Sequence, residues 1–185
     1  MLLFGSLVSG GTRGKIVQIF MTSKTLHQIA HDNALTIPRI AKLLRASKIR
    51  FPNRKAQSLV TNRNIRIKDV LEDLSAFSGT TLQHERWVRL ALKSELPGMG
   101  LKEVSNFLKW SGFSKHLAVL DSINLSFLKW TGAVDHLVTP GRLSDYRVYY
   151  AFENWQNELA GRLGITVSEL DNLIVFDWEM HIRSR

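Results

Sequence analysis

The sequence predicts an all-α protein, and three of its features support this class. Apolar residues recur at positions i, i+3 and i+4, a spacing that gathers them on one face of a helix. No run of alternating apolar and polar residues predicts a strand. Four prolines and scattered glycines interrupt the helical spacing and divide the chain into a succession of helices.

Three predicted helices begin at residues that typically cap helices: Asp121, Ser144 or Asp145, and Thr166 with Glu169 three residues later. We find no internal repeat. Residues 132–142 form the longest predicted irregular stretch, where a hinge or lobe boundary is expected. The predicted helices span 22–33, 36–46, 53–62, 67–78, 81–95, 101–111, 121–131, 143–163 and 166–177.

The bulk composition limits both size and partner. A chain of 185 residues fits a single domain over 1–185, built as two small helical lobes around a cleft. Lys and Arg outnumber Asp and Glu by 25 to 16, and the resulting net charge of +9 favours a polyanionic partner. A soluble basic protein without such a partner is the alternative. Because no stretch reaches the roughly 18 apolar residues of a membrane span, we expect no membrane association and an intracellular, cytoplasmic or nucleoid location.

Several classes of chemistry are excluded. The chain has no cysteine, so disulfides, thiolate zinc sites, cysteine-ligated iron–sulfur clusters and cysteine nucleophiles are ruled out. The 9–15 segment resembles a phosphate loop but lacks the first glycine and has Ile16 where Ser or Thr is required. His27 and His31 are spaced by four residues without a following glutamate, which favours an exposed helix face over a zinc site.

A short glycine-containing segment, Leu96-Pro97-Gly98-Met99-Gly100, joins two predicted helices into a helix-hairpin-helix over about 82–112. Gly98 and Gly100 permit backbone angles and close approaches that side chains would block. Amides at the start of the second helix are then expected to face a phosphate. A glycine turn between helices is more often only structural, so the residues that follow it decide its meaning.

Lys102 lies in the first turn after the hairpin, where the positive end of the helix dipole disfavours an ammonium ion. A neutral lysine in that place can act as a nucleophile. Asp121 follows 19 residues later (121 − 102), after the intervening helix, and is expected to face Lys102. Taken alone, Asp121 is better explained as an ordinary N-cap.

Three stretches resemble the signature of helix-hairpin-helix base-excision glycosylases, above all the archaeal-type 8-oxoguanine DNA glycosylase/AP lyase family. They are the hairpin with Leu101-Lys102-Glu103, the following Phe107-Leu108 and Gly112, and Leu117-Ala118-Val119-Leu120-Asp121. The upstream segment Ile49-Arg50-Phe51-Pro52-Asn53-Arg54-Lys55-Ala56 and the downstream Glu169-Leu170-Asp171 are similar to further family segments. The likeness covers roughly residues 36–178.

The resemblance implies an enzyme that excises an oxidised purine, with 8-oxoguanine expected first, from double-stranded DNA. It implies Lys102 as the nucleophile that forms a Schiff base and Asp121 as its carboxylate partner, with β-elimination as the lyase step. It also implies a hairpin that holds a phosphate through Leu96, Gly98 and Gly100. We expect a monomer and no cofactor or metal, apart from a possible monovalent cation at the hairpin.

The remaining candidate residues are basic or aromatic. Arg50, Arg54 and Lys55, continued by Arg63 and Arg66, form a basic stretch that either follows the DNA backbone or is a solvated helix face. Phe176, Trp178 and Arg185 are the candidates for the pocket that holds the flipped base. The other tryptophans have helical spacing among apolar residues, which favours a position in the core or in the packing between lobes: Trp87, Trp110, Trp130 and Trp155.

Two alternatives remain. A noncatalytic helix-hairpin-helix DNA-binding module would use Lys102 only as a phosphate contact. A related glycosylase with another base specificity, or an enzyme reduced to AP lyase activity, is indicated by Ser122-Ile123-Asn124, where related enzymes usually place a histidine.

Overall fold

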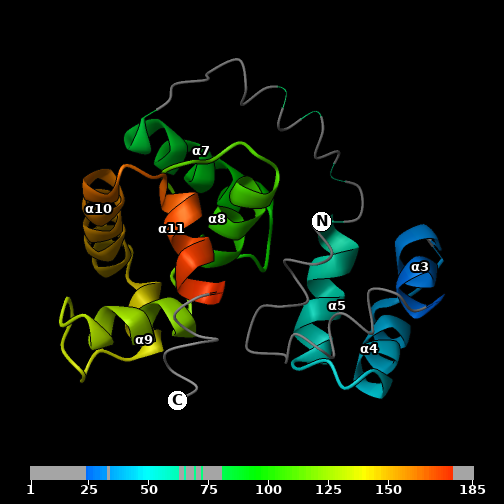
Figure 1. Ribbon diagram of the computed structural model, residues 1–185. Coiled ribbons are helices and arrows are strands. Elements are labelled where there is room, and N and C mark those ends of the chain that lie inside the picture. The colour runs from blue at the N-terminus through cyan, green and yellow to red at the C-terminus, as the bar shows by residue number, and fades with distance from the viewer. Residues whose placement is uncertain are drawn as a thin grey trace. The chain divides into compact units, whose positions relative to one another are not determined.

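A computed structural model describes residues 24–32, 34–62, 65, 69, 72 and 81–176, and these residues contain helices and no strand. The all-α prediction is confirmed for this part of the chain. The predicted 67–78 helix falls almost entirely outside the described residues, as does the 9–15 segment. The chain divides into two compact units, drawn in Figure 1, and each contains two separate stretches of sequence.

Unit 1 comprises Met1–Phe77 and Ala91–Met99. Its described helices are α3 (Lys24–His31), α4 (Ile37–Ala46) and α5 (Pro52–Thr61). Both α4 and α5 have a proline in the first turn, where the missing N–H has no intrahelical partner to lose. The helices α4 and α5 pack against each other over one apolar cluster, which consists of Ile29, Leu35, Ile40, Ala41, Leu44, Ile49, Ala56 and Leu59.

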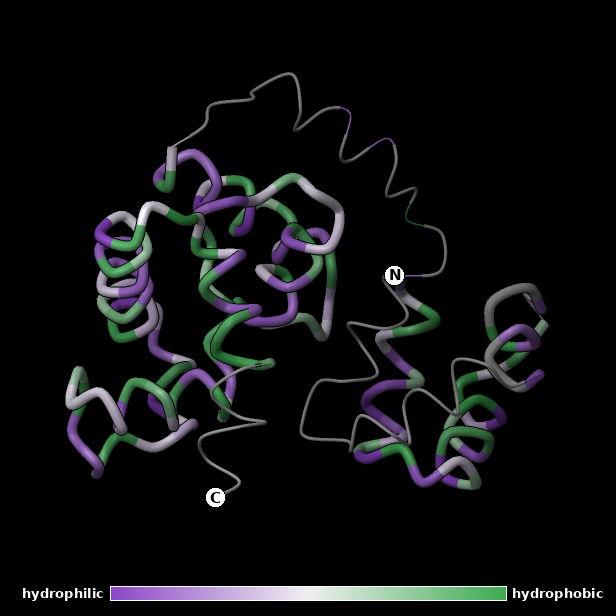
Figure 2. The backbone as a smooth tube through the Cα atoms, in the orientation of Figure 1, coloured by the Kyte–Doolittle hydropathy of each residue, from purple (hydrophilic) through white to green (hydrophobic). Residues whose placement is uncertain are grey.

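Unit 2 comprises Ser78–Leu90 and Gly100–Arg185. It holds most of α7 (Leu82–Glu95), and all of α8 (Leu101–Trp110), α9 (Ser122–Trp130), the short 3₁₀ helix η2 (Pro140–Ser144), α10 (Tyr146–Leu163) and α11 (Val167–Leu173). Hydrophobic and hydrophilic residues alternate along α10 in Figure 2, as expected for a helix with one buried face. The core of this unit contains Leu101, Ala118, Leu120, Leu125, Leu128, Leu143, Tyr149, Ala160, Val167, Leu170 and Ile174.

The predicted helix starts are confirmed. Asp121 caps α9, Asp145 rather than Ser144 caps α10, and Thr166 with Glu169 forms a reciprocal capping box on α11. The predicted hinge at 132–142 is wrong, because this stretch lies inside unit 2 and the unit boundaries fall at 77/78, 90/91 and 99/100.

The expectation of no internal repeat is also wrong. Phe107-Leu108-Lys109-Trp110-Ser111-Gly112 and Phe127-Leu128-Lys129-Trp130-Thr131-Gly132 differ at one position in six. Both segments end a helix at the tryptophan and place the glycine in the left-handed region, at φ +75° and +73°. In both, the amide after the glycine donates to the leucine carbonyl at 3.0 and 2.9 Å. The same six-residue pattern therefore builds the same helix end twice.

Candidate active site

The hairpin is held by α5 within unit 1. Asn62 Nδ2 donates to the carbonyl of Pro97 at 3.2 Å, and the Leu96 side chain is fully buried. Gly98 has φ +86°, and a Cβ built on it would lie 2.1 Å from Ser58 Oγ. Gly98 thus requires glycine for its backbone angle, as the sequence predicted, and also for its closeness to α5.

Gly100 differs from that expectation. Its φ of −90° and ψ of −178° describe extended backbone that any residue adopts, and its amide donates to Glu103 Oε2 at 3.1 Å. The prediction that the Gly100 amide faces a phosphate is therefore wrong for this conformation. No partner is present for the first-turn amides of Leu101, Lys102 and Glu103 among the described residues, because the first helical bond of α8 runs from Val104 N to Gly100 O.

Two carbonyls of the hairpin accept hydrogen bonds, and the monovalent cation expected at the hairpin stays a prediction. The Leu96 carbonyl accepts from Met99 N at 3.1 Å, and the Pro97 carbonyl accepts from Asn62. Within the described parts of the chain, no group of three or more His, Asp or Glu is placed to hold a metal ion. We therefore derive no step through a bound cation.

Lys102 is the second residue of α8, and its side chain is 32% exposed. Its ammonium lies 3.2 Å from Glu103 Oε1. The Glu103 carboxylate therefore contacts both Lys102 and the Gly100 amide, and its negative charge compensates the positive end of the helix dipole at this turn.

Asp121 is a partly exposed residue at the N-cap of α9. Its Oδ1 accepts both capping bonds, from Ile123 N at 2.8 Å and Asn124 N at 3.0 Å. Its Oδ2 has no hydrogen-bond partner among the described residues. One oxygen therefore caps the helix while the other stays available to a ligand, so the two explanations of Asp121 are compatible.

The chain reaches Asp121 through residues 114–120, called here the buried segment. It has no regular structure, yet Leu117, Ala118, Val119 and Leu120 are at most 7% exposed. Side chains from the surrounding helices satisfy its backbone, because an unpaired buried amide would destabilise the fold. Glu85 of α7 alone accepts four hydrogen bonds, from Ser114 Oγ and from the amides of Lys115, His116 and Leu117, at 2.7 to 3.2 Å.

Two residues of α10 hold the middle of the buried segment. The Tyr149 hydroxyl donates to the Ala118 carbonyl at 2.7 Å, and Glu153 Oε1 accepts from the Ala118 amide at 3.0 Å. Glu153 also pairs with the buried Arg89 at 2.6 Å. Burial opposes the positive charge of Arg89, but the Glu153 carboxylate outweighs burial and raises the pKa of the guanidinium.

A second buried polar group adjoins Asp121. Asp171 of α11 is paired with Lys109 of α8 and accepts from Asn124 Nδ2 at 2.7 Å, while Asn124 Oδ1 accepts from Gln156 at 2.6 Å. Burial raises the pKa of Asp171, although the Lys109 charge opposes this shift. Asn124 therefore connects the helix that Asp121 caps with the helix that carries Lys102.

The predicted basic stretch divides into exposed and buried members. Arg50 and Arg54 are exposed, and their guanidinium groups each lie 5.2 Å from the centre of the Phe51 ring. Phe51 itself is 47% exposed and has φ 53°, a strained angle for a bulky residue. Lys55 is only 2% exposed, so its prediction as a direct DNA contact is wrong for this conformation. Arg63 and Arg66 lie outside the described residues.

The aromatic predictions have mixed outcomes. Phe176 is 62% exposed, while Trp178 and Arg185 lie outside the described residues, so the base pocket stays a prediction. The core assignment of the other tryptophans is wrong for Trp87, Trp110 and Trp130, which are 50%, 66% and 59% exposed. Each stands on the solvent side of its helix, whereas Trp155 packs against the core of unit 2.

Sequence reasoning missed the residues that hold the buried segment. A signal was present: Glu85, Val88, Arg89 and Leu92 share one face of α7, so two charged residues interrupt an apolar stripe. On α10, Tyr149, Glu153 and Gln156 share a face with Ala160 in the same way. Charged residues inside a buried stripe indicate a satisfied polar network.

The sequence matches a known protein family and known relatives. The family model described as 8-oxoguanine DNA glycosylase (Ogg-HhH) matches residues 17–165. An 8-oxoguanine DNA glycosylase/AP lyase of Methanocaldococcus jannaschii is 29% identical over 143 residues, covering 76% of this chain and 63% of that protein. One from Korarchaeum cryptofilum is 31% identical over 122 residues, covering 66% and 54%. The chain thus spans less than two thirds of the length of these two relatives.

Solved structures agree in fold. The M. jannaschii 8-oxoguanine DNA glycosylase has a TM-score of 0.73 at 23% identity, over 97% of this chain and 76% of that one. The Thermotoga maritima 8-oxoguanine DNA glycosylase has a TM-score of 0.70 at 20% identity, over 97% and 77%. Because the family model covers most of the sequence, from ahead of α3 to the end of α10, this chain belongs to the 8-oxoguanine DNA glycosylase family with a helix-hairpin-helix fold.

Proposed function

We propose that this protein is a bifunctional DNA glycosylase and AP lyase that removes an oxidised purine, in first place 8-oxoguanine, from double-stranded DNA. The observation that carries the proposal is the placement of Lys102 and Asp121. Lys102 lies in the first turn after the hairpin with a third of its side chain exposed, and one carboxylate oxygen of Asp121 has no partner among the residues that the structure describes. Both belong to unit 2. The named relatives supply the substrate class, since one was solved with DNA that contains 8-oxoguanine.

The reaction requires the damaged nucleotide to leave the base stack, which costs a few kcal/mol. The Lys102 amine, once deprotonated, attacks the anomeric carbon of the sugar, and the bond to the base breaks with its electron pair leaving on the base. Opening of the sugar ring gives a Schiff base between Lys102 Nζ and that carbon. Loss of a proton from the adjacent carbon then expels the 3′ phosphate by β-elimination.

Asp121 has two roles in this proposal. Its Oδ2 accepts the proton that Lys102 must lose and passes it to the departing base, and the carboxylate, negative again, stabilises the positive charge that develops on the sugar. Neither role requires the oxygen that caps α9. No cofactor is needed for these steps, and we propose that the protein acts as a monomer inside the cell.

Borohydride trapping tests the proposal directly. Duplexes with 8-oxoguanine, an abasic site or guanine are incubated with the protein, and the reduced Schiff base is detected as a covalent adduct. We expect an adduct on the first two duplexes that disappears in Lys102→Gln and weakens strongly in Asp121→Asn. Lys129→Gln, at a lysine of α9 whose ammonium donates to the His136 carbonyl, serves as the control. An adduct that persists in Lys102→Gln would exclude Lys102 as the nucleophile.

The Lys102–Glu103 ion pair favours a second candidate, a noncatalytic DNA-binding module in which the ammonium contacts a phosphate. Under that reading the wild-type protein binds damaged and undamaged duplexes alike and forms no adduct. A related glycosylase with another base specificity would form the covalent adduct on the abasic duplex but not on the 8-oxoguanine duplex. The same three duplexes therefore separate all three functions.

A further inference from the structure

Lys102 lies on α8 and Asp121 caps α9, so a reaction that uses both residues depends on the contacts that fix α8 and the N-terminus of α9 against each other. On α8, one turn after Lys102, Ser105 is fully buried. Its Oγ accepts a hydrogen bond from Arg89 Nη1 at 2.9 Å and lies 3.4 Å from the Tyr149 hydroxyl. Ser105 thus ties the helix of the proposed nucleophile to the interior of unit 2.

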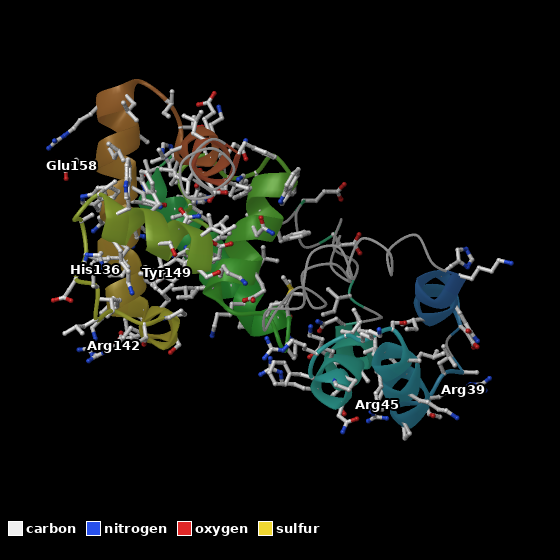
Figure 3. The ribbon with its side chains drawn as sticks, turned by 60° about the horizontal axis from the view of Figure 1, so that its bottom comes forward. Arg39, Arg45, His136, Arg142, Tyr149 and Glu158 are labelled. Atoms are coloured by element: carbon white, nitrogen blue, oxygen red, sulfur yellow. The ribbon has the colours of Figure 1, made fainter. Side chains whose placement is uncertain are left out.

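Figure 3 labels Tyr149 among the packed side chains of unit 2. Its hydroxyl contacts both Ser105 of α8 and the buried segment. Its hydroxyl donates to the Ala118 carbonyl at 2.7 Å and accepts from the Leu120 amide at 3.3 Å. Burial raises the pKa of Tyr149, so its single proton stays in place. Because that proton is used on Ala118, the contact with Ser105 has the serine as donor.

Both hydroxyl protons are then used inside the protein. Ser105 accepts from Arg89 and donates to Tyr149, while Tyr149 donates to Ala118 and accepts from Leu120 and Ser105. Leu120 directly precedes Asp121. The path from the first turn of α8 to Asp121 therefore runs through two buried hydroxyl groups, and nothing in it reaches solvent.

We propose that Tyr149 is a positioning residue for the reaction: its hydroxyl fixes the Ala118–Leu120 backbone, and hence Asp121, against Ser105 and the first turn of α8 that carries Lys102. The inference rests on the proposed function, since it concerns the same reaction. Tyr149 does not touch DNA in this role. A displacement of about 1 Å between reacting groups can slow a reaction about a hundredfold.

The test compares single-turnover excision on the 8-oxoguanine duplex, with enzyme in excess, for wild type, Tyr149→Phe, Ser105→Ala and the double variant. We expect the maximal rate of Tyr149→Phe to fall by about ten- to hundredfold while the protein concentration at half-maximal rate stays unchanged. Because both changes break one path, the double variant is expected to be no slower than the slower single variant.

Val167→Ala is the matched control for lost stability. Val167 is buried in the same core as Tyr149, and its aliphatic side chain takes part in none of the hydrogen bonds of the path described. Its melting temperature falls, and its maximal rate below that temperature is expected to stay at the wild-type value. If Tyr149→Phe does not fold, Ser105→Ala alone carries the test, with the same expected loss of maximal rate.

The outcomes separate the two proposals. A wild-type protein that forms no Schiff base on any duplex overturns the proposed function and this inference together. An active wild type with a Tyr149→Phe variant of equal maximal rate overturns the inference alone. So do equal losses in Tyr149→Phe and Val167→Ala, or strictly additive losses in the double variant.

Discussion

At the hairpin, the chain can pass close to α5 because residue 98 is a glycine and has no Cβ. Gly98 combines a left-handed backbone angle with a site where a Cβ would lie 2.1 Å from Ser58 Oγ and 2.9 Å from Ser58 Cβ. Gly132 has a similar angle, φ +73°, but open space around it. The two glycines therefore separate the cost of backbone angle from the cost of crowding.

We predict that Gly132→Ala destabilises the protein by roughly 1 to 2 kcal/mol through its backbone angle alone. Gly98→Ala is expected to cost about 1 to 3 kcal/mol more, because Ser58 must move. Chemical denaturation measures both. Adding Ser58→Gly should recover most of the excess for Gly98→Ala, and a failure of this rescue would contradict the steric explanation.

Lys109 and Lys129 occupy matching positions in the repeated segment but differ in environment. The Lys109 side chain is 10% exposed and paired with the buried Asp171, whereas Lys129 Nζ donates to the His136 carbonyl in an exposed place. We predict that Lys109→Met destabilises the protein by about 3 to 5 kcal/mol at pH 7, because it leaves a buried carboxylate unpaired. Lys129→Met is expected to change stability by roughly 0.5 kcal/mol or less.

The sign of the pH effect follows from the raised pKa of Asp171. When the pKa of an acid is higher in the folded than in the unfolded state, the folded protein loses stability as pH rises through the folded pKa. The reason is that the unfolded state gives up the proton at a lower pH. Without Lys109 the carboxyl is protonated more readily. The loss in Lys109→Met should therefore shrink as pH falls from 7 toward 4, as measured by melting temperature, and a loss that is constant over this range would refute the assignment.

At the scale of elements, local signals predicted the helices well. Capping residues, prolines and periodic apolar positions fixed most helix limits to within one or two residues. The start of α10 differs, because Pro140–Ser144 forms a separate 3₁₀ turn before Asp145 begins the helix. Lys102 and the capping role of Asp121 could likewise be predicted from their places beside a hairpin and a helix start.

The buried segment was beyond such reasoning. Residues 114–120 carry no periodic pattern, and their hydrogen-bond partners lie far away in sequence, from Glu85 to Ser168. Only tertiary structure brings these together. The exposed tryptophans show the same limit, since helical spacing among apolar residues does not tell which face meets solvent.

We predict that Glu85→Ala destabilises the protein by roughly 3 to 5 kcal/mol, because it removes the acceptor of three amides and one hydroxyl that are buried or partly buried. Glu85→Gln should be intermediate, since its amide group keeps one acceptor oxygen. Glu95→Ala, at an exposed position on the same helix, is the control and should be close to wild type. Urea denaturation of the three variants gives the ranking.

The capping box of α11 predicts a pH dependence of its own. Backbone and side-chain hydrogen bonds from Thr166 lower the pKa of Glu169 below its ordinary value of 4.5. A carboxylate with a lowered folded pKa contributes stability above that ordinary value and loses it as pH falls through the folded one. The stability advantage of wild type over Glu169→Gln should therefore disappear as pH falls below 4.5. Glu158→Gln, on the exposed face of α10, provides the comparison in the same thermal melts.

At the scale of the whole molecule, neither unit is a continuous stretch of sequence, because the chain passes from one to the other three times. No helix of the described residues is long and apolar enough to cross a membrane. The net charge of +9 favours a polyanionic partner, and we propose that this partner is DNA, with exposed arginines of unit 1 as the backbone contacts.

We predict that affinity for a damaged duplex falls linearly with the logarithm of salt concentration. Arg50→Ala and Arg54→Ala should each reduce the slope by about one, because each removes one phosphate contact. Lys55→Ala should leave the slope unchanged, since its side chain is buried. Fluorescence anisotropy between low and physiological salt measures these slopes, and an equal effect of Lys55→Ala would show that its side chain reaches DNA.

The buried segment also determines the order in which the molecule assembles. The bonds that shape the first turn of α8, between Glu103 and both Gly100 and Lys102, join near neighbours in sequence and form as soon as the helix does. The segment that ends at Asp121 depends on partners 29 to 54 residues away, which meet only after long loops have closed. We therefore expect a chain that has not yet joined α7, α10 and α11 to present Lys102 on a helix while Asp121 has no fixed place, so that the proposed reaction requires the last steps of folding.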